Sequence, residues 1–212
     1  MAYIFFVMSR KRIHKKPIID GDKVIGFAAV EKPIKILVCN KSEADKLVIE
    51  HHYSHKATKN SFLSFLVYYN DVVSGVLQLG YGIRPKKMKG GHDSSETREF
   101  DRMWLSDDMP KFSETIVLSL MHHYIKMVYP EIKYIVSYAD TTVGNTGTIY
   151  MAANYKFIEA IKADLYILAD GERVHPVTMW HRHKTRKWDV LTKIYPGISK
   201  PKGKQLKFIY EL

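Results

Sequence analysis

A carboxylate and a phenol flank a loop of small polar residues near the middle of the chain. Asp140 ends an apolar stretch over residues 132–139, and Tyr150 lies on a short predicted helix over residues 148–153. A strand-end carboxylate beside a glycine-containing loop is a common way for α/β enzymes to build a site. Two interpretations remain open. The pair belongs to a site, or the segment is an ordinary strand–turn–helix corner in which Asp140 caps the helix.

A second group of candidates ends a predicted helix that begins with Ser42 as its cap. The sequence HHYSHK over residues 51–56 holds three imidazoles, a phenol and an ammonium group. Such groups can bind metals or contact bases, although protonated histidines also suit the C-terminus of a helix. We expect one of the three histidines to have a chemical role.

Arg102 is the third candidate, in a predicted strand over residues 98–105. Strict alternation places Phe100, Arg102 and Trp104 on one face, with Glu99, Asp101 and Met103 on the other. An arginine between bulky aromatics either keeps its charge in water at a sheet edge or lies in a site. Its permanent charge suits a carboxylate, a phosphate or a developing oxyanion.

The apolar pattern predicts the elements that must position these side chains. We expect helices over residues 42–51, 113–128 and 148–153, and strands over residues 3–8, 23–29, 34–39, 62–69, 72–79, 98–105, 132–139, 155–161, 164–169 and 206–210. Asn70 and Asp71 form a hairpin turn, and residues 10–22 form a basic connection. We interpret His122 and His123 as surface residues, and WHRHK at 180–184 as a solvated basic face rather than a metal site.

Composition narrows the class of protein. The chain has 212 residues, a single cysteine (Cys39) and a formal net charge of +11. No apolar stretch is long enough to predict a membrane span. One cysteine excludes an internal disulfide and a cysteine-rich zinc site, so a reducing cytoplasm is expected. Basic segments at 10–16, 84–89 and 182–212 flank a mildly acidic centre, which favours a nucleic-acid partner over a merely soluble basic protein.

The order of elements resembles the GNAT acyltransferase superfamily, and TIYMAANYKF at 148–157 resembles its Leu-Tyr-x-x-x-Gly-Phe segment. Asn154-Tyr155 replaces the Gly-Phe. The resemblance implies an α+β fold with a central mixed, mostly antiparallel twisted sheet flanked by helices. It also implies that Tyr150 can act as a general acid. We expect residues 1–212 to form a single domain with basic N-terminal and C-terminal extensions.

A closer resemblance is to the phage Mom family of DNA-modification proteins. It rests on HYSHKATKNSFLSF at 52–65, GVLQLG at 75–80, EFDRMWLSDDMPKFSET at 99–115 and SYADTTVGNTGTIYMAANYKF at 137–157. It implies a bound iron and conversion of adenine in double-stranded DNA to its N6-carbamoylmethyl derivative, which protects phage DNA from restriction in the host cytoplasm. The positions that match the family's motifs most strongly are His52, Arg102, Asp140 and Tyr150, and the weaker matches are Tyr53, Lys56 and Ser119.

Two chemical roles for these positions remain open. His52, Asp140 and Tyr150 could bind a non-haem iron, or Asp140 could be a base and Tyr150 an acid. We expect an aromatic side chain such as Tyr53 or Phe62 to stack on a flipped base, and the DNA to lie against Lys56, Arg84, Lys86 and Lys87.

The group donor is also open. The place of the coenzyme A pyrophosphate loop holds SDDMPKFSET, with Asp107, Asp108 and no glycine, which argues against a standard acetyl-CoA site. The expected donor is therefore acetyl-CoA bound in another way, or another activated group. The alternatives to DNA modification are an N-acyltransferase acting on a protein or small-molecule amine, and a non-catalytic DNA-binding accessory protein. We also expect that two copies of the chain can form a homodimer.

Overall fold

The computed structural model describes residues 13–82 and 93–212, and the chain divides into two compact units. Unit 1 comprises Met1–Ile135 with Glu211–Leu212, and unit 2 comprises Val136–Tyr210. The predicted strand over residues 3–8 and the basic positions Arg84, Lys86 and Lys87 lie outside the described residues. No described helix is long and apolar enough to span a membrane.

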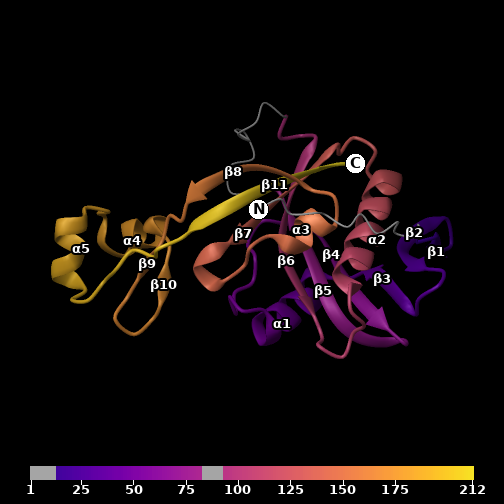
Figure 1. Cartoon of the computed structure of the whole chain (residues 1–212), viewed down its shortest axis with the longest axis horizontal. Coiled ribbons are helices and arrows are strands. Elements are labelled where there is room, and N and C mark those ends of the chain that lie inside the picture. The colour runs from indigo at the N-terminus through magenta and orange to yellow at the C-terminus, as the bar shows by residue number, and fades with distance from the viewer. Residues whose placement is uncertain (1–12, 83–92) are drawn as a thin grey trace, which may run out of the picture. The chain divides into compact units, whose positions relative to one another are not determined.

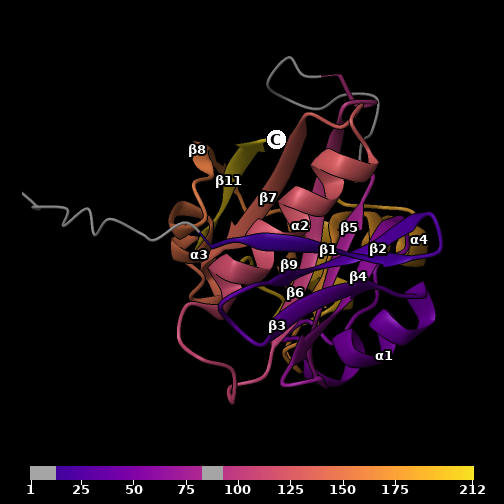
Figure 2. The same ribbon diagram turned by 90° about the vertical axis from the view of Figure 1, so that its right-hand side faces the viewer.

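Unit 1 contains an antiparallel sheet in the order β1-β2-β3-β4-β5-β6 (Figures 1 and 2). Its strands are β1 (Lys15–Asp20), β2 (Lys23–Ala29), β3 (Ile34–Val38), β4 (Ser61–Tyr69), β5 (Val72–Gly80) and β6 (Thr97–Leu105). The predicted β4–β5 hairpin is confirmed, because Asn70 and Asp71 both have positive φ, as a tight two-residue turn requires. The prediction of a basic connection over residues 10–22 was wrong: β1 pairs with β2. Its lysines and proline are typical of an edge strand.

Two helices cover opposite faces of this sheet. Helix α1 (Lys41–His51) packs through Ala44 and Val48 on Val76 and Trp104. Helix α2 (Ser113–Val128) packs through Tyr124 on Phe27 and Phe65. Phe65 and Leu66 are adjacent in β4, and Leu66 pairs with Val76, so the two helices meet alternate side chains of the same strands. The cap of α1 is Asn40, in a capping box with Glu43, rather than the predicted Ser42.

A β-bulge in β6 overturns the predicted alternation around Arg102. Gln78 pairs with Arg102, but Leu79 pairs with Phe100, so Asp101 is an extra residue in β6. Phe100 therefore lies on the face opposite to Arg102, whereas Trp104 shares the face of Arg102 as predicted. The alternation of side chains along the sequence could not reveal the bulge, because one inserted residue moves every later side chain to the other face of the sheet.

The surface interpretation of His122 is also wrong, although His123 is exposed as predicted. His122 is only 5% exposed on α2. Burial, followed by the nearby charges of Lys15 and His123, lowers its pKa to about 3. The apolar stripe of α2 is thus wide enough to include His122, because a sheet-covering helix is buried over more than its central row.

Unit 2 contains strands in the order β7-β11-β8, from β7 (Tyr134–Asp140), β8 (Lys156–Lys162) and β11 (Lys204–Glu211). A 3-10 turn η1 (Thr141–Val143) and α3 (Thr148–Ala152) follow β7, and Asn154 has the positive φ expected of a helix-ending residue.

The remainder of unit 2 forms a second small core. Strands β9 (Tyr166–Ile167) and β10 (Arg173–Val174) pair with each other, beside α4 (Pro176–His183) and α5 (Trp188–Ile194) (Figure 1). The buried cluster consists of Tyr166, Leu168, Val174, Met179, Leu191 and Ile198. The predicted strand over residues 164–169 is therefore much shorter, and the two helices were not predicted. Their sequences are short and rich in charge, so the apolar period is weak.

Candidate functional site

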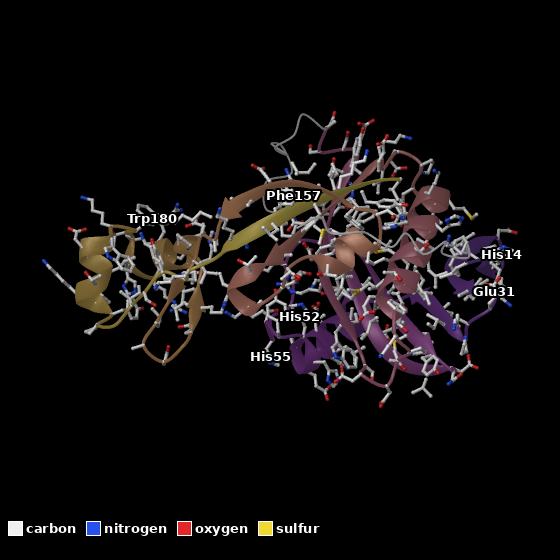
Figure 3. All side chains as sticks on the ribbon, in the orientation of Figure 1. His14, Glu31, His52, His55, Phe157 and Trp180 are labelled. Carbon is white, nitrogen blue, oxygen red and sulfur yellow. The ribbon has the colours of Figure 1, made fainter. Side chains whose placement is uncertain are left out.

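His52 lies in unit 1 at the C-terminal cap of α1, with His55 nearby (Figure 3). Its side chain is buried, and its Nδ1 accepts a hydrogen bond from the Ser54 backbone N–H at 3.1 Å and contacts Ser54 Oγ at 2.8 Å. Because Nδ1 accepts, the neutral ring carries its proton on Nε2. Burial, followed by the charges of Arg102 and His55, lowers the pKa of His52 to about 4. At neutral pH, His52 is therefore an uncharged hydrogen-bond donor.

Arg102 ties the segment after α1 to β6. Its Nη1 donates to its neighbour's carbonyl, Asp101 O, at 2.8 Å, and its Nε donates to Lys56 O at 3.4 Å. The ring of exposed Tyr53 lies 4.3 Å from that of His52. The structure thus brings together four of the predicted positions in unit 1, namely His52, Tyr53, Lys56 and Arg102.

Asp101 is a candidate that the sequence reasoning missed. Burial raises its pKa to about 6, despite the opposing effects of Arg102 and a hydrogen bond with Glu99. The bulge directs its carboxylate over Gly80, where a Cβ would lie 2.3 Å from Asp101 Oδ2 and 2.5 Å from Asn60 O. Gly80 is therefore needed for close approach. The available signal was its place beside Arg102 in the EFDRM element.

Gln78 is a second missed position, on the same face as Arg102. It is fully buried, lies opposite Arg102 in the sheet, and donates through Nε2 to Asp45 Oδ1 at 2.8 Å. Asp45 also pairs with Lys41. This hydrogen bond fixes α1, and hence His52 at its end, against the centre of the sheet.

Asp140 forms a separate polar cluster within unit 2. Its Oδ1 accepts from the Thr142 backbone N–H at 2.9 Å and from the Thr142 hydroxyl, and its Oδ2 accepts from Arg173 Nη2 at 2.6 Å. Asp140 therefore caps η1, whereas the predicted short helix, α3, has Gly147 as its N-cap. Arg173 was not predicted, because it comes from β10, more than thirty residues further along the chain, and the sequence carries no sign of this pairing.

Tyr150 lies on α3, at the end of the same β7–α3 segment as Asp140. It is only 9% exposed, and its ring lies 5.4 Å from both the Tyr155 ring and the Phe208 ring. Gly147, with φ of 75°, begins this helix, and a Cβ there would lie 2.3 Å from Phe208. Close packing of Gly147 on Phe208 therefore sets the position of α3.

The surroundings of Asp140 do not fit the iron that the resemblance implies. Among the described residues, no group of three or more His, Cys, Asp or Glu side chains could hold a metal ion. Both oxygens of Asp140 are already engaged, one of them by a guanidinium. A carboxylate neutralised by arginine is a poor ligand for a cation, so no chemical step is assigned to iron here.

Ser119, the remaining predicted position, does not lie with the unit 1 group of His52, Tyr53, Lys56 and Arg102. It lies half-buried on α2, the helix that covers the opposite face of the unit 1 sheet from α1.

Comparisons with known proteins match most of the chain. A model of the Mom protein family matches residues 33–212. The methylcarbamoylase Mom of Escherichia phage Mu is 32% identical over 176 residues, which cover 80% of this chain and 71% of that protein. The ribosomal L7/L12 alpha-N-protein acetyltransferase RimL, solved with coenzyme A, has a TM-score of 0.50 at 10% identity, over 87% of this chain and 97% of that chain. The likeness confirms the predicted α+β acetyltransferase fold.

Proposed function

Because the chain belongs to the Mom protein family, we propose that it is a transferase that converts adenine in double-stranded DNA to its N6-carbamoylmethyl derivative. The observation that carries this proposal is the 32% identity to the phage Mu methylcarbamoylase. Such a modification would protect phage DNA from restriction in the host cytoplasm.

The chemistry requires a weak nucleophile to be oriented and activated. The adenine N6 lone pair is delocalised into the ring, and the base is inaccessible inside a duplex, so it must first be flipped out. The new bond joins N6 to the methylene carbon of an activated donor. The donor's leaving group departs with the bonding electrons, and N6 gives up one proton.

The unit 1 cluster offers groups for these tasks. Asp101, with its pKa near 6, is ionised at neutral pH but more basic than an ordinary carboxylate, so it suits acceptance of the N6 proton. His52 Nε2–H and the Arg102 guanidinium suit stabilisation of negative charge on the departing group. Exposed Tyr53 suits stacking on the flipped base.

The unit 2 positions take different roles in this proposal. Tyr150 is the proposed proton donor, as the superfamily resemblance implies. Asp140 is a proposed positioning residue, because its bonds to Arg173 and Thr142 hold the segment that leads from β7 to α3.

The donor is an activated group, and coenzyme A is one carrier to test. The segment between β6 and α2 holds Asp107 and Asp108, both exposed, whose charges oppose a pyrophosphate at the start of α2. An N-acyltransferase acting on a protein or small amine requires tight acetyl-CoA binding, which calorimetry measures directly.

Expression in a bacterium followed by mass spectrometry of the nucleosides tests the proposal. We expect modified deoxyadenosine, lost in His52→Gln and Tyr150→Phe and strongly reduced in Arg102→Gln. Unmodified DNA from a well-expressed, soluble wild-type chain contradicts the proposal. Full protection of phage DNA by Asp140→Asn and Tyr150→Phe would instead indicate a non-catalytic DNA-binding protein.

A further inference from the structure

One face of helix α4 in unit 2 packs on the second small core. Pro176 and Met179 are buried, and Met179 belongs to the cluster with Val174 and Leu191. The helix is further fixed because His183 Nε2 lies 2.8 Å from Tyr195 Oη. The opposite face of α4 is therefore turned away from this core.

That outward face combines apolar and basic side chains at helical spacing. Val177, Trp180 and His181 are spaced three and four residues apart and form a stripe on α4, and Lys184 follows it as the C-cap, with a left-handed backbone. All four are exposed, with Trp180 at 45% (Figure 3). A tryptophan left half-exposed on a helix between basic groups is typical of a binding surface rather than of a core.

The chain around this stripe is strongly positive. Residues 173–204 contain nine Lys and Arg against one acidic residue, Asp189. Arg173 pairs with Asp140, and Arg182 donates two hydrogen bonds to Glu172. Arg186 and Lys187, which follow α4 in the chain, are also exposed. We call these six residues, Val177, Trp180, His181, Lys184, Arg186 and Lys187, the α4 surface.

We infer that the α4 surface docks on the phosphate backbone of duplex DNA. The inference rests on the proposed action on DNA and names where unit 2 contacts the duplex. Lys184, Arg186 and Lys187 neutralise phosphates, and Trp180 packs against the sugar and base edges between them. A polyanion matches this surface because it supplies regularly spaced negative charge to side chains that follow one another along the helix and its exit segment.

Fluorescence anisotropy of the full chain with a short labelled duplex tests the inference. The variant Lys184→Gln/Arg186→Gln/Lys187→Gln should bind at least about tenfold more weakly at ~0.1 M salt, and the slope of log affinity against log salt should fall by about 2 to 3. The matched control Lys23→Gln/Lys32→Gln/Lys126→Gln removes the same charge from exposed positions of unit 1 and should retain most of the slope.

The tryptophan is tested separately because it carries no charge. Trp180→Ala should weaken binding by about 5- to 100-fold with an unchanged salt slope, whereas Trp180→Phe retains most of the affinity. Thermal unfolding of both triple variants should match the wild type, because their substituted side chains are exposed. Trp180 is only half-exposed, so binding by Trp180→Ala is measured below its own melting temperature.

Binding and modification can fail independently in this design. A wild-type chain that binds the duplex without modifying it contradicts the proposed reaction, while weak binding by the triple variant still supports the α4 surface. Equal salt slopes for the triple variant and the wild type overturn the inference. Unchanged duplex binding together with lost binding to anionic lipid vesicles also overturns it.

Discussion

The pKa of Asp101 lies above that of His52, which is the reverse of the usual order for a carboxylate and an imidazole. A carboxylate in water has a pKa about 2.5 units below that of an imidazole. Here burial raises the pKa of Asp101 to about 6 and lowers that of His52 to about 4. At neutral pH, Asp101 is therefore a carboxylate that is more basic than usual, and His52 is an uncharged imidazole. A charged base of this kind suits proton removal from a neutral amine, and an uncharged imidazole can donate a hydrogen bond without adding positive charge.

Substitution of Asp101 separates its chemical role from its effect on stability. Asp101→Asn should lower the modification rate by about 100-fold. The wild-type rate should rise as pH increases through about 6, and this rise should be absent in the variant. Single-turnover assays with duplex DNA measure both effects. Asp107→Asn, which removes an exposed carboxylate from the segment after β6, is the control, and a similar rate loss there would contradict the assignment.

The same substitution should stabilise the protein. The pKa of Asp101 is about 6 in the folded protein, above the ordinary value of 3.8, so its contribution to stability is present below pH ~4 and is lost as pH rises through about 6. Asp101→Asn removes this destabilisation and should raise the free energy of unfolding at pH 7 by about 1–3 kcal/mol. Urea titration at pH 4 and pH 7 measures the change, which should appear only at the higher pH.

His122 should make the fold sensitive to acid. Its pKa is about 3 when folded and near 6.5 when unfolded, so its contribution to stability is present above pH 6.5 and is lost as pH falls. Between pH 6.5 and 4 this loss amounts to about 3 kcal/mol. His122→Gln should flatten the decline in melting temperature over that range, whereas the exposed control His14→Gln should not. Identical pH profiles for His122→Gln and the wild type would argue against a buried neutral ring.

At the scale of elements, the position of the unit 1 cluster depends on the bulge in β6 and on its neighbour in β5. The bulge re-aims Asp101, and the carboxylate then fits only because Gly80 has no side chain. On the same face, Gln78 holds α1 through Asp45, and Arg102 holds the segment after α1. Strands β5 and β6 thus fix both ends of the cluster, which a loop alone would leave mobile.

Filling the space at Gly80 should disturb the cluster directly. Gly80→Ala places a methyl group against the Asp101 carboxylate and a backbone oxygen, and the backbone oxygen cannot move aside cheaply. We expect a loss of about 1–3 kcal/mol in the free energy of unfolding, together with lower activity. Chemical denaturation measures the first effect. Gly144→Asn, at an open position whose positive φ asparagine tolerates, should change little.

At the scale of the whole molecule, the formal charge of +11 should dominate encounter with DNA. We expect the KM for duplex DNA to rise steeply between ~50 and ~200 mM salt, while kcat changes little, because counterion release acts on binding rather than on chemistry. Steady-state assays across that range provide the measurement. An unchanged KM would show that the positive charge does not contribute to substrate binding.

The sequence by itself determined most of the elements, the acetyltransferase fold and the family. These depend on local periodicity, on turn residues such as Asn70-Asp71, and on motifs that are contiguous in the chain. It also placed Arg102 and Trp104 on one face, since they are two residues apart beyond the bulge. The elements that escaped prediction include β1, which was expected to be a connection, and α4 and α5, whose core is assembled from short segments with few apolar positions.

Only the tertiary structure decided which groups surround the candidate residues. The bulge at Asp101, the raised pKa of its carboxyl and the need for glycine at position 80 all arise from pairing between β5 and β6. The engagement of Asp140 by Arg173 joins positions far apart in the chain. Burial and long-range pairing set proton affinity and hydrogen-bond partners, and neither follows from residue type or spacing alone.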